Sequence, residues 1–287
     1  PIDQAVEYMK AAITKSYGKK GDTILNMNYA AVDRGVDGAV KVEIPASWAT
    51  AEDTEAAAAR KTTEFVKNIV EPMNAQEGDK LPVSAFSGRE DGHFPTGTAA
   101  YEKRGIAVDI PIWQSETCIQ CNRCAYVCPH AAIRPVALTE EELAKAPEGL
   151  KAIDMIGMPG MKFTMTVSAY DCTGCGSCAN VCPGKKGEKA LVMGNMEENA
   201  GEQVYFDFGT EIEVKPEVVA KFKENTVKGS QFKQPLLEFS GACAGCGETP
   251  YAKLITQLFG DRMYIANATG CSSIWGNSSP STPYTVN

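Results

Sequence analysis

The chain has 287 residues, which is enough for about two domains of ordinary size. Hydrophobic residues make up 44% of it and charged residues 22%, so it can bury hydrophobic cores and is not mainly disordered. The net charge of −8 argues against nucleic acid as the main partner, because phosphate binding needs clustered Lys and Arg. The apolar runs are far shorter than the ~18 residues of a membrane span, so we expect no membrane-spanning helix.

The two ends of the sequence look like cuts inside a longer polypeptide. The chain begins at Pro1, without a methionine, and runs at once into a helical pattern of apolar residues. It stops at Asn287 in a run of Ser, Thr, Pro and Gly that is typical of a loop inside a domain. We therefore expect a segment of a longer protein, with a trimmed small protein as the alternative.

Residues 1–50 have the pattern of the end of an α/β unit. Apolar residues three and four apart predict one helix over Asp3–Tyr17 and a second over Thr23–Asp33. A strand should follow, since apolar and charged residues then alternate. Its apolar positions are Val40, Val42 and Ile44.

Residues 51–108 are interpreted as a linker domain. Thr50 is a suitable cap for a helix that Pro72 should limit. Residues 74–100 are rich in Gly, Pro, Ser and Thr, which predicts a long ordered loop.

Residues 109–215 are expected to form a cysteine-rich domain. A short helix is predicted over Leu138–Ala146, where Thr139 and Glu142 have the spacing of a capping box. The alternating segments Met161–Ala169 and Gln203–Phe208 predict strands.

Residues 216–287 read as the beginning of another α/β domain. Helices are predicted over Pro216–Asn225 and Thr249–Phe259, both with proline near the start. A strand is predicted at Met263–Ala266. Strands and helices that alternate in this way are typical of α/β folds.

The eleven cysteines are the unusual feature of the composition. An odd number excludes a fully paired disulfide framework within the chain, and metal binding is the better interpretation in the absence of a signal peptide. Eight of them form two runs with the same spacing, C-x2-C-x2-C-x3-C-P. The first run contains Cys118, Cys121, Cys124 and Cys128. The second contains Cys172, Cys175, Cys178 and Cys182.

This spacing predicts two iron–sulfur clusters. Three thiolates two residues apart can wrap one face of a cubane, whereas in two-cluster bacterial ferredoxins the fourth ligates the other cluster. One [4Fe-4S] cluster should therefore be bound by Cys118, Cys121, Cys124 and Cys182. The other should be bound by Cys172, Cys175, Cys178 and Cys128. Zinc prefers two separated cysteine pairs, and disulfides within such runs have poor geometry, so both alternatives are weaker.

A third group of cysteines is incomplete. Cys243, Cys246 and Cys271 supply three thiolates where a cubane needs four. Taken alone, these residues also allow buried structural cysteines or an incomplete zinc site. They lie before a predicted helix and after a predicted strand, in the kind of loop where α/β proteins hold ligands.

Four features, in this order along the chain, resemble the pyruvate:ferredoxin oxidoreductase family, also called pyruvate synthase. The segment Gly97–Gly105 contains Glu102-Lys103-Arg104 and looks like the family's EKR connector. The double cysteine run follows, then Gly-x-Cys-x-x-Cys-Gly-Glu-Thr-Pro over Gly241–Pro250, then Thr-Gly-Cys-Ser around Cys271. Together these features cover about residues 97–287.

The resemblance implies a multidomain α+β fold in which a bacterial-type 2[4Fe-4S] ferredoxin domain (109–215) follows an EKR domain (51–108). The flanking α/β fragments would be the end of a γ-like, Rossmann-like domain (1–50) and the start of a thiamine diphosphate-binding domain (216–287). Cys243, Cys246 and Cys271 would then bind a third [4Fe-4S] cluster, with the fourth ligand outside this chain. Glu248 and Cys271 would line the thiamine diphosphate pocket. The Gly-Asp-Gly motif with a following Asn is missing, so the ligands of Mg²⁺ would also lie outside.

The function implied is oxidative decarboxylation of pyruvate with coenzyme A to acetyl-CoA and CO2. Electrons would pass through three clusters to ferredoxin or flavodoxin, and we expect a cytoplasmic homodimer. With two histidines in the chain, no acid–base catalyst is assigned to this segment. The alternatives are a stand-alone polyferredoxin, the same architecture acting on another 2-oxo acid, and a structural zinc-ribbon protein.

Overall fold

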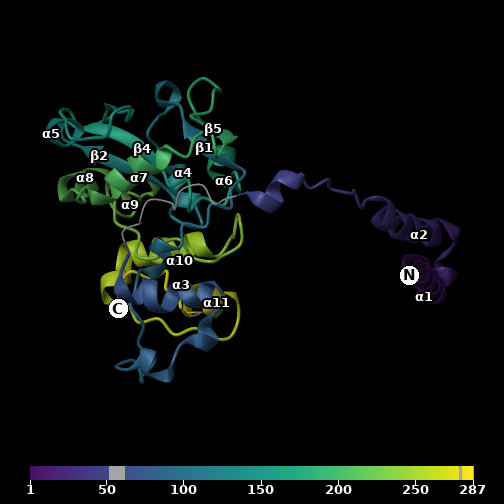
Figure 1. Cartoon of the computed structure of the whole chain (residues 1–287). Coiled ribbons are helices and arrows are strands. Elements are labelled where there is room, and N and C mark those ends of the chain that lie inside the picture. The colour runs from purple at the N-terminus through teal and green to yellow at the C-terminus, as the bar shows by residue number, and fades with distance from the viewer. Residues whose placement is uncertain (52–61, 278–279, 287) are drawn as a thin grey trace. The chain divides into compact units, whose positions relative to one another are not determined.

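The computed structural model describes residues 1–51, 62–277 and 280–286. The chain divides into two compact units, Pro1–Arg60 and Lys61–Asn287, which are described separately (Figure 1). No helix in the described ranges is both long enough and apolar enough to cross a membrane.

The first unit is a pair of helices. Helix α1 (Ile2–Tyr17) packs against α2 (Asp22–Asp37), and an ion pair of 2.5 Å joins Lys10 to Asp33. Both predicted helices are therefore confirmed. Neither helix contains a buried residue, so this pair has no hydrophobic core of its own.

The strand predicted around Val42 is wrong. Residues 39–45 are irregular, and the side chains of Val40, Val42 and Ile44 are exposed. A strand needs a neighbour to accept its backbone hydrogen bonds, and the described part of this unit contains no other strand. The helix predicted from Thr50 falls largely on residues 52–61, which lie outside the described residues.

The second unit begins with a helical segment that Pro72 does not end. A π-helical turn, Val66–Val70, leads directly into α3 (Glu71–Asn74), with Pro72 in the first turn of that helix. Proline is tolerated there because its missing N–H is one of those left unpaired at a helix start. The loop predicted over residues 74–100 is present, with short 3-10 turns within it.

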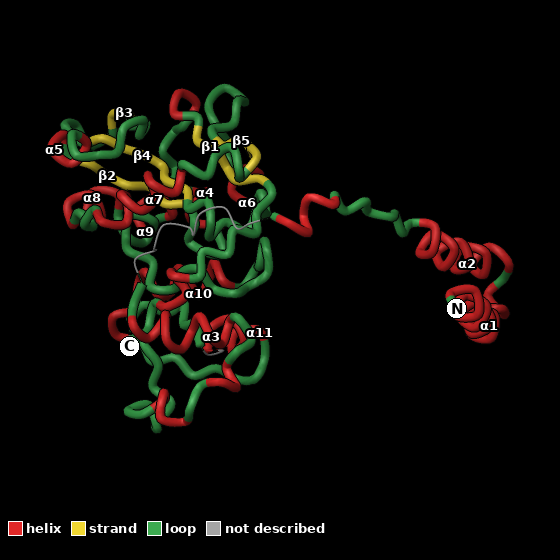
Figure 2. Tube along the Cα trace, viewed as in Figure 1, coloured by secondary structure: helices red, strands yellow, loops and turns green. Residues whose placement is uncertain are grey.

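The cysteine-rich region contains two small antiparallel sheets (Figure 2). In one, β1 (Asp109–Trp113) pairs with β5 (Leu191–Asn195) so that Trp113 lies opposite Leu191. In the other, the strand order is β2-β4-β3, with β2 (Ile133–Leu138), β4 (Lys162–Val167) and β3 (Ile153–Asp154). The predicted strand at Met161–Ala169 is thus confirmed as β4.

Helices connect and cover these sheets. The short helices α4 (Arg123–Val127) and α6 (Ser177–Val181) contact each other. Helix α5 (Glu140–Leu143) carries the predicted capping box: the Thr139 hydroxyl accepts from the Glu142 N–H at 3.2 Å, and the Glu142 carboxylate accepts from the Thr139 N–H at 2.8 Å.

The strand predicted over Gln203–Phe208 is wrong. This segment lies within α7 (Glu202–Glu211), which packs on β4 and β2. The helix buries Gln203 and Phe206, three residues apart, so the buried face follows the helical period instead of strand alternation. Helix and sheet approach closely at Gly209, where a Cβ atom would lie 3.0 Å from Val136 Cγ2.

The C-terminal part is mainly helical. Its helices are α8 (Pro216–Phe222), α9 (Val227–Ser230), α10 (Thr249–Phe259) and α11 (Cys271–Asn277). The predicted helices at Pro216 and Thr249 are confirmed. The predicted strand Met263–Ala266 is irregular, and Tyr264 and Ile265 are exposed. The described residues on either side of the cysteine-rich region contain no parallel sheet, so the Rossmann-like and thiamine diphosphate-binding assignments stay predictions.

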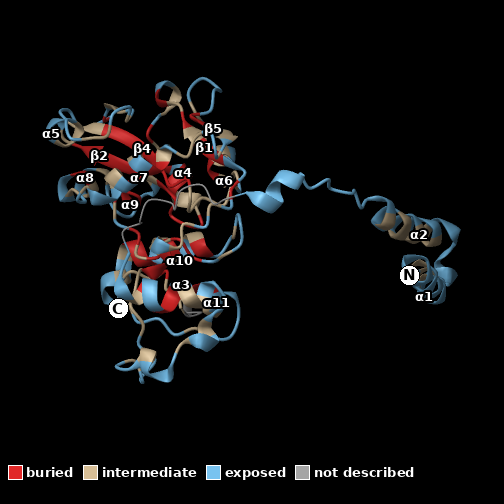
Figure 3. Ribbon diagram, viewed as in Figure 1, coloured by how far each residue is buried: buried red, intermediate tan, exposed pale blue. Residues whose placement is uncertain are grey.

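The main hydrophobic core lies between the β2–β4 sheet and the short helices (Figure 3). Phe163 is fully buried at its centre and makes edge-to-face contacts with Trp113 and Phe232, with ring centroids 6.0 and 6.3 Å apart. Burial of each such aromatic ring contributes about 2 kcal/mol. Cys124 and Cys178 belong to this core, so the cysteine runs are part of the packed interior.

Candidate metal centres

Two cavities are each lined by four cysteines. We call cavity A the one that contains Cys118, Cys121, Cys124 and Cys182, with an empty volume of about 350 Å³. Cavity B contains Cys172, Cys175, Cys178 and Cys128, with an empty volume of about 380 Å³. Each cavity therefore gathers the first three cysteines of one run and the last cysteine of the other.

Helices α4 and α6 produce this exchange of the fourth cysteine. Each helix has its third cysteine in the first turn and its fourth at the C-cap, so α4 carries Cys124 and Cys128 at opposite ends. Four residues of helix advance by about 6 Å, which directs the two thiols to different cavities. Left-handed residues precede both helices, Asn122 with φ 59° and Gly176 with φ 72°. The chain can therefore turn sharply between the second and third cysteines of each run.

Several thiols of these cavities are poor anions without a bound cation. Burial, together with nearby thiolates such as Cys128, raises the pKa of Cys172 and Cys178 to about 12. Burial raises the pKa of Cys124 as well. Four thiols gathered in one cavity, one of them buried, therefore fit a bound group that carries positive iron, because metal ligation deprotonates cysteine.

All eleven cysteines are free thiols, so the disulfide alternative is wrong. In the ranges that the structure describes, no group of three or more His, Cys, Asp or Glu side chains is arranged to hold a single metal ion. Zinc would need its ligands within ~2.3 Å of one point. The sulfur-only donor sets around cavities fit a cubane, whose four thiolates bind different iron atoms.

Backbone amides point at the sulfurs. The N–H groups of Gln120, Gly174 and Ala190 donate to the Sγ atoms of a cysteine in their cavity at 3.3–3.4 Å. Such bonds stabilise negative charge on ligating sulfur and adjust the reduction potential. Gly174 has φ 67°, and a Cβ atom there would lie 3.0 Å from the Asp109 carbonyl oxygen. Close packing as well as backbone conformation therefore requires glycine at this position.

Apolar residues line the walls of the two cavities. Trp113, Met165 and Leu191 lie around cavity A, and Ile133, Val167 and Met193 lie around cavity B. The Met165 sulfur is 3.9 Å from Cys124 Sγ, so this methionine packs directly against a cysteine of cavity A. Ile119 also lines cavity A, although it is exposed.

The third cysteine group is arranged differently. Cys243 and Cys271 are exposed, Cys246 is half-buried, and Glu248 is exposed at the N-cap of α10. Burial raises the pKa of Cys246, but the N–H groups of Thr249 and Glu248 outweigh burial and lower it. The group lies against cavity B: a Cβ atom on Gly245 would be 3.6 Å from Cys175 Cβ.

Two further residues lie near the cavities. His130 lines cavity B and is buried, and its Nδ1 is 3.1 Å from the Ser240 carbonyl oxygen. Lys253 of α10 is buried, although a lysine in an amphipathic helix normally faces solvent. Its Nζ donates to the Ala125 carbonyl oxygen of α4, and no pattern in the sequence marks this contact.

Comparison with known proteins gives two domain matches and several close relatives. Residues 117–186 match the 4Fe-4S dicluster domain, and residues 51–107 match EKR, described as a domain of unknown function.

The whole chain is 59% identical to a pyruvate:ferredoxin oxidoreductase of Moorella thermoacetica and 55% identical to a pyruvate-flavodoxin oxidoreductase of Enterobacter agglomerans, covering 24% of each. It is 46% identical to a pyruvate dehydrogenase [NADP(+)] of Cryptosporidium parvum, again over the whole chain but covering 16% of that protein. The chain thus spans a quarter or less of the length of these relatives.

Proposed function

The chain belongs, as a segment, to the pyruvate:ferredoxin (flavodoxin) oxidoreductase family, and from this premise we propose that it carries the electrons of that reaction. The parent enzyme would oxidatively decarboxylate pyruvate with coenzyme A to acetyl-CoA and CO2. The observation that carries the proposal is the pair of four-cysteine cavities with their exchanged fourth ligands.

Cavities A and B would each hold one [4Fe-4S] cluster through the four cysteines that line them. When bound, such clusters supply one-electron transfer at potentials that the protein adjusts. The residues of this chain hold the sulfurs in place through α4 and α6, donate N–H bonds to them, and exclude water with apolar walls. The segment therefore provides two fixed centres in a shared core.

Cys243, Cys246 and Cys271 would bind a third [4Fe-4S] cluster together with a cysteine outside this chain. Glu248 and Cys271 would line the thiamine diphosphate pocket, while the Mg²⁺ ligands would also come from outside. The contact between Gly245 and Cys175 supports this arrangement, because it places the third group beside a cysteine of cavity B. The flanking residues 1–50 and 216–287 would be the end of the γ-like domain and the start of the thiamine diphosphate-binding domain.

The partners would be a ferredoxin or a flavodoxin as electron acceptor, pyruvate and coenzyme A as substrates, and the rest of the parent polypeptide. Among the relatives, one is named for ferredoxin, others for flavodoxin and two for NADP(+), so the acceptor varies within this family. We place the enzyme in the cytoplasm as a homodimer.

Metal analysis of the anaerobically purified chain tests the proposal. Iron and acid-labile sulfide should each approach about eight atoms per chain for the two ferredoxin-type clusters. Zinc in place of iron would defeat it. Pyruvate- and coenzyme A-dependent dye reduction by the full-length polypeptide then separates the enzyme from a stand-alone polyferredoxin, which would carry the same iron but reduce no dye with pyruvate.

A further inference from the structure

Lys253 is a buried cation without a carboxylate partner among the described residues. Its side chain is 2% exposed, and its hydrogen-bond acceptor is the backbone carbonyl oxygen of Ala125. The ion pairs found in the described ranges do not include it. A buried ammonium group is unfavourable unless negative charge compensates for it, and one carbonyl dipole does so only in part.

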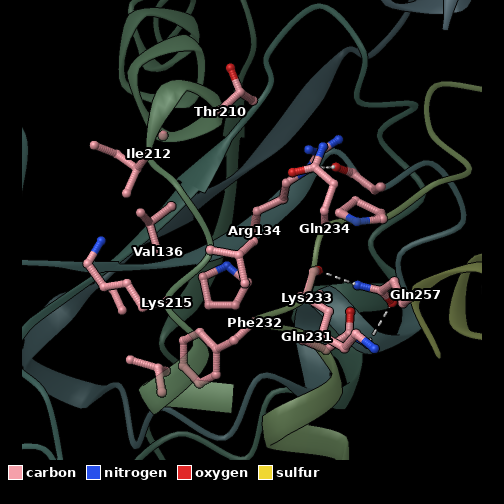
Figure 4. Close-up of a pocket in the computed structure, with 18 of the residues that line it drawn as sticks. Arg134, Val136, Thr210, Ile212, Lys215, Gln231, Phe232, Lys233, Gln234 and Gln257 are labelled. Carbon is pink, nitrogen blue, oxygen red and sulfur yellow. Dashed lines mark hydrogen bonds between the residues drawn. The ribbon is translucent and has the colours of Figure 1, made fainter. Parts of the chain in front are cut away.

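The other basic side chains around Lys253 do have carboxylate partners, which makes its lack of one in the described residues informative. Four basic side chains line the same pocket: Lys253 and three that Figure 4 labels, Arg134, Lys215 and Lys233. The last three have carboxylate partners in Glu238, Glu142 and Glu224, respectively. Lys253 is therefore the exception within one pocket, and its compensating charge must come from another source.

The position of Ala125 identifies that source. Ala125 lies in α4 between Cys124, which lines cavity A, and Cys128, which lines cavity B. Burial lowers the pKa of Lys253 to about 8, and Arg134 acts in the same direction, whereas the thiolates of Cys128 and then Cys124 oppose them. The same carbonyl oxygen of Ala125 accepts from the N–H of Cys128 at 3.3 Å, so the ammonium group lies against the helix that carries a ligand of each cavity.

We propose that Lys253 is the shared buried counter-cation of cavities A and B, and that its charge raises the reduction potential of the clusters bound there. This inference rests on the proposed function, since it requires clusters in both cavities. A cluster with four thiolate ligands is anionic and gains a further negative charge on reduction, so a fixed positive charge nearby stabilises the reduced form. Because α10 follows directly after Cys246 and Glu248, the same helix links the third cysteine group to both cavities.

The experiment compares midpoint potentials in the full chain, purified anaerobically and titrated with EPR detection of the reduced clusters. Lys253→Gln keeps a donor for the Ala125 carbonyl oxygen but removes the charge, and Lys253→Met removes both. Both variants should lower the two midpoint potentials, with the larger shift for the cluster of cavity B. Lys253→Arg, which keeps the charge, should restore potentials close to wild type.

Lys215→Met is the matched control. Lys215 lines the same pocket but lies across it from Gln257 of α10 and pairs with Glu142 at 2.9 Å (Figure 4). Its loss should leave both potentials unchanged. Unchanged potentials in Lys253→Gln with a full complement of iron would overturn the inference, and equal shifts in Lys215→Met would do so too. Wild-type chain without iron would instead defeat the proposed function.

A separate observation concerns the Glu102-Lys103-Arg104 triad, which lies in the domain of unknown function. Each residue bonds a different distant segment. Glu102 accepts from the hydroxyl of Ser281, Lys103 Nζ lies 2.5 Å from the Asp171 carboxylate, and Arg104 donates to the Ser240 carbonyl oxygen at 3.3 Å.

Two of these partners lead directly to cysteines. Asp171 precedes Cys172 of cavity B, and its side chain is 3% exposed. Ser240 lies three residues before Cys243, and its carbonyl oxygen also lies 3.1 Å from Nδ1 of His130, which follows Cys128-Pro129. The structure assigns the triad a positioning role: it braces the third cysteine group against cavity B. This inference, too, rests on the proposed function, because it concerns the separation of two clusters.

The positioning role of the triad can be tested in the full-length polypeptide by the magnetic coupling between reduced clusters. Lys103→Met and Arg104→Met should weaken the spin–spin splitting of the EPR signal between the third cluster and that of cavity B, while Lys103→Arg should restore it. Lys162→Met removes a pair with Asp154 far from the triad in sequence and serves as the control. Full iron with unchanged splitting in Lys103→Met and Arg104→Met would overturn this role, whereas wild type without three clusters would defeat the proposed function.

Discussion

The cysteines of cavities A and B and those of the third group differ in how the chain surrounds them. Most cysteines of the cavities belong to, or pack against, a core that contains Trp113 and Phe163, and among them Cys175 is the exposed one. In the third group, Cys243 and Cys271 are exposed, and the helix that follows Cys246 is held by polar contacts. A ligand set that is complete within the chain is thus built into its core, whereas a set with three of four ligands stays at the surface.

In the ferredoxin region, residues that would bind the clusters also form the hydrophobic core. Cys124 and Cys178 are core residues, and Cys118, Cys128 and Cys182 pack against the same core. Loss of a cluster there leaves a cavity lined by thiols, which is a packing defect as well as a chemical one. The same loss at the third group should disturb little of the fold.

Removal of iron is expected to have the largest effect. A chelator under anaerobic conditions should destabilise the β2–β4 sheet by on the order of 10 kcal/mol, the scale of structural metal sites. The helix pair α1–α2 should keep its protection, because it belongs to the other compact unit. Hydrogen exchange read by peptide measures both regions. If the iron-free chain kept native hydrogen-exchange protection in β4, the core would not depend on the clusters.

Single cysteine substitutions sharpen the comparison. Cys124→Ser should lower iron by about four atoms per chain and destabilise the ferredoxin region, because a buried ligand of cavity A is lost. Cys271→Ser should leave the iron of both cavities and the unfolding midpoint unchanged. Metal analysis and chemical unfolding of both variants measure this. If both substitutions destabilised the chain equally, the cysteines of the cavities and those of the third group would not differ in their contribution to the fold.

Gly184→Ala should destabilise the turn that follows Cys182. Gly184 has φ 57°, and a Cβ atom there would lie 1.7 Å from the Glu188 carbonyl oxygen, so the backbone must shift. We expect a loss of more than ~2 kcal/mol in the free energy of unfolding, together with loss of iron from cavity A.

Gly187→Ala is the control for this turn. Gly187 also has a positive φ, 88°, but a Cβ atom there meets nothing within 4 Å. Its cost should be about 1 kcal/mol, the cost of a left-handed alanine, with iron retained. If the two variants are equally stable, the close contact at Gly184 is not the cause.

The capping box of α5 lies away from the cysteines and should have a smaller effect. Thr139→Ala removes the hydroxyl that accepts from the Glu142 N–H, at a cost of about 1 kcal/mol in the free energy of unfolding. Thr210→Ala removes an exposed hydroxyl of α7 and should change stability by less than ~0.5 kcal/mol. Both should keep full iron, as measured beside urea unfolding.

The pH dependence of the Glu142 contribution gives the smallest effect. Burial raises the pKa of Glu142, but hydrogen bonds from Lys215 and Thr139 outweigh burial and hold it below its ordinary value. A lowered pKa means that the carboxylate contributes stability above its unfolded pKa and loses it as pH falls through the folded pKa. The stability difference between wild type and Glu142→Gln should therefore shrink in acid, and a difference that grows in acid would refute this.

Local patterns predicted most of the helices but failed for isolated strands. The capping box at Thr139 and the proline starts of α8 and α10 depend on contacts within one turn, so the sequence was sufficient. Alternation of apolar and polar residues around Val42 and Tyr264 was not sufficient to predict a strand. A strand forms only beside a partner strand, and none lies next to these segments in the described residues. Residues Gln203–Phe208 form a helix and not the predicted strand because α7 packs against the β2–β4 sheet.

Helix α10 shows why the site itself was only partly predictable. Its apolar residues Tyr251, Ile255 and Phe259 are exposed, while its buried face contains Thr256, Gln257 and Lys253. The usual expectation for an amphipathic helix is the reverse. A helix that packs on polar and charged neighbours cannot be recognised from its own periodicity.

The grouping of the eight cysteines into two sets of four followed from the sequence alone, because spacing along a short helix fixes which thiols diverge. The position of a lysine between those two sets did not follow from it. Lys253 and its acceptor Ala125 are 128 residues apart, so only the folded chain brings that charge beside the sulfurs. Distant contacts of this kind depend on how the helices pack against each other, which no local pattern records.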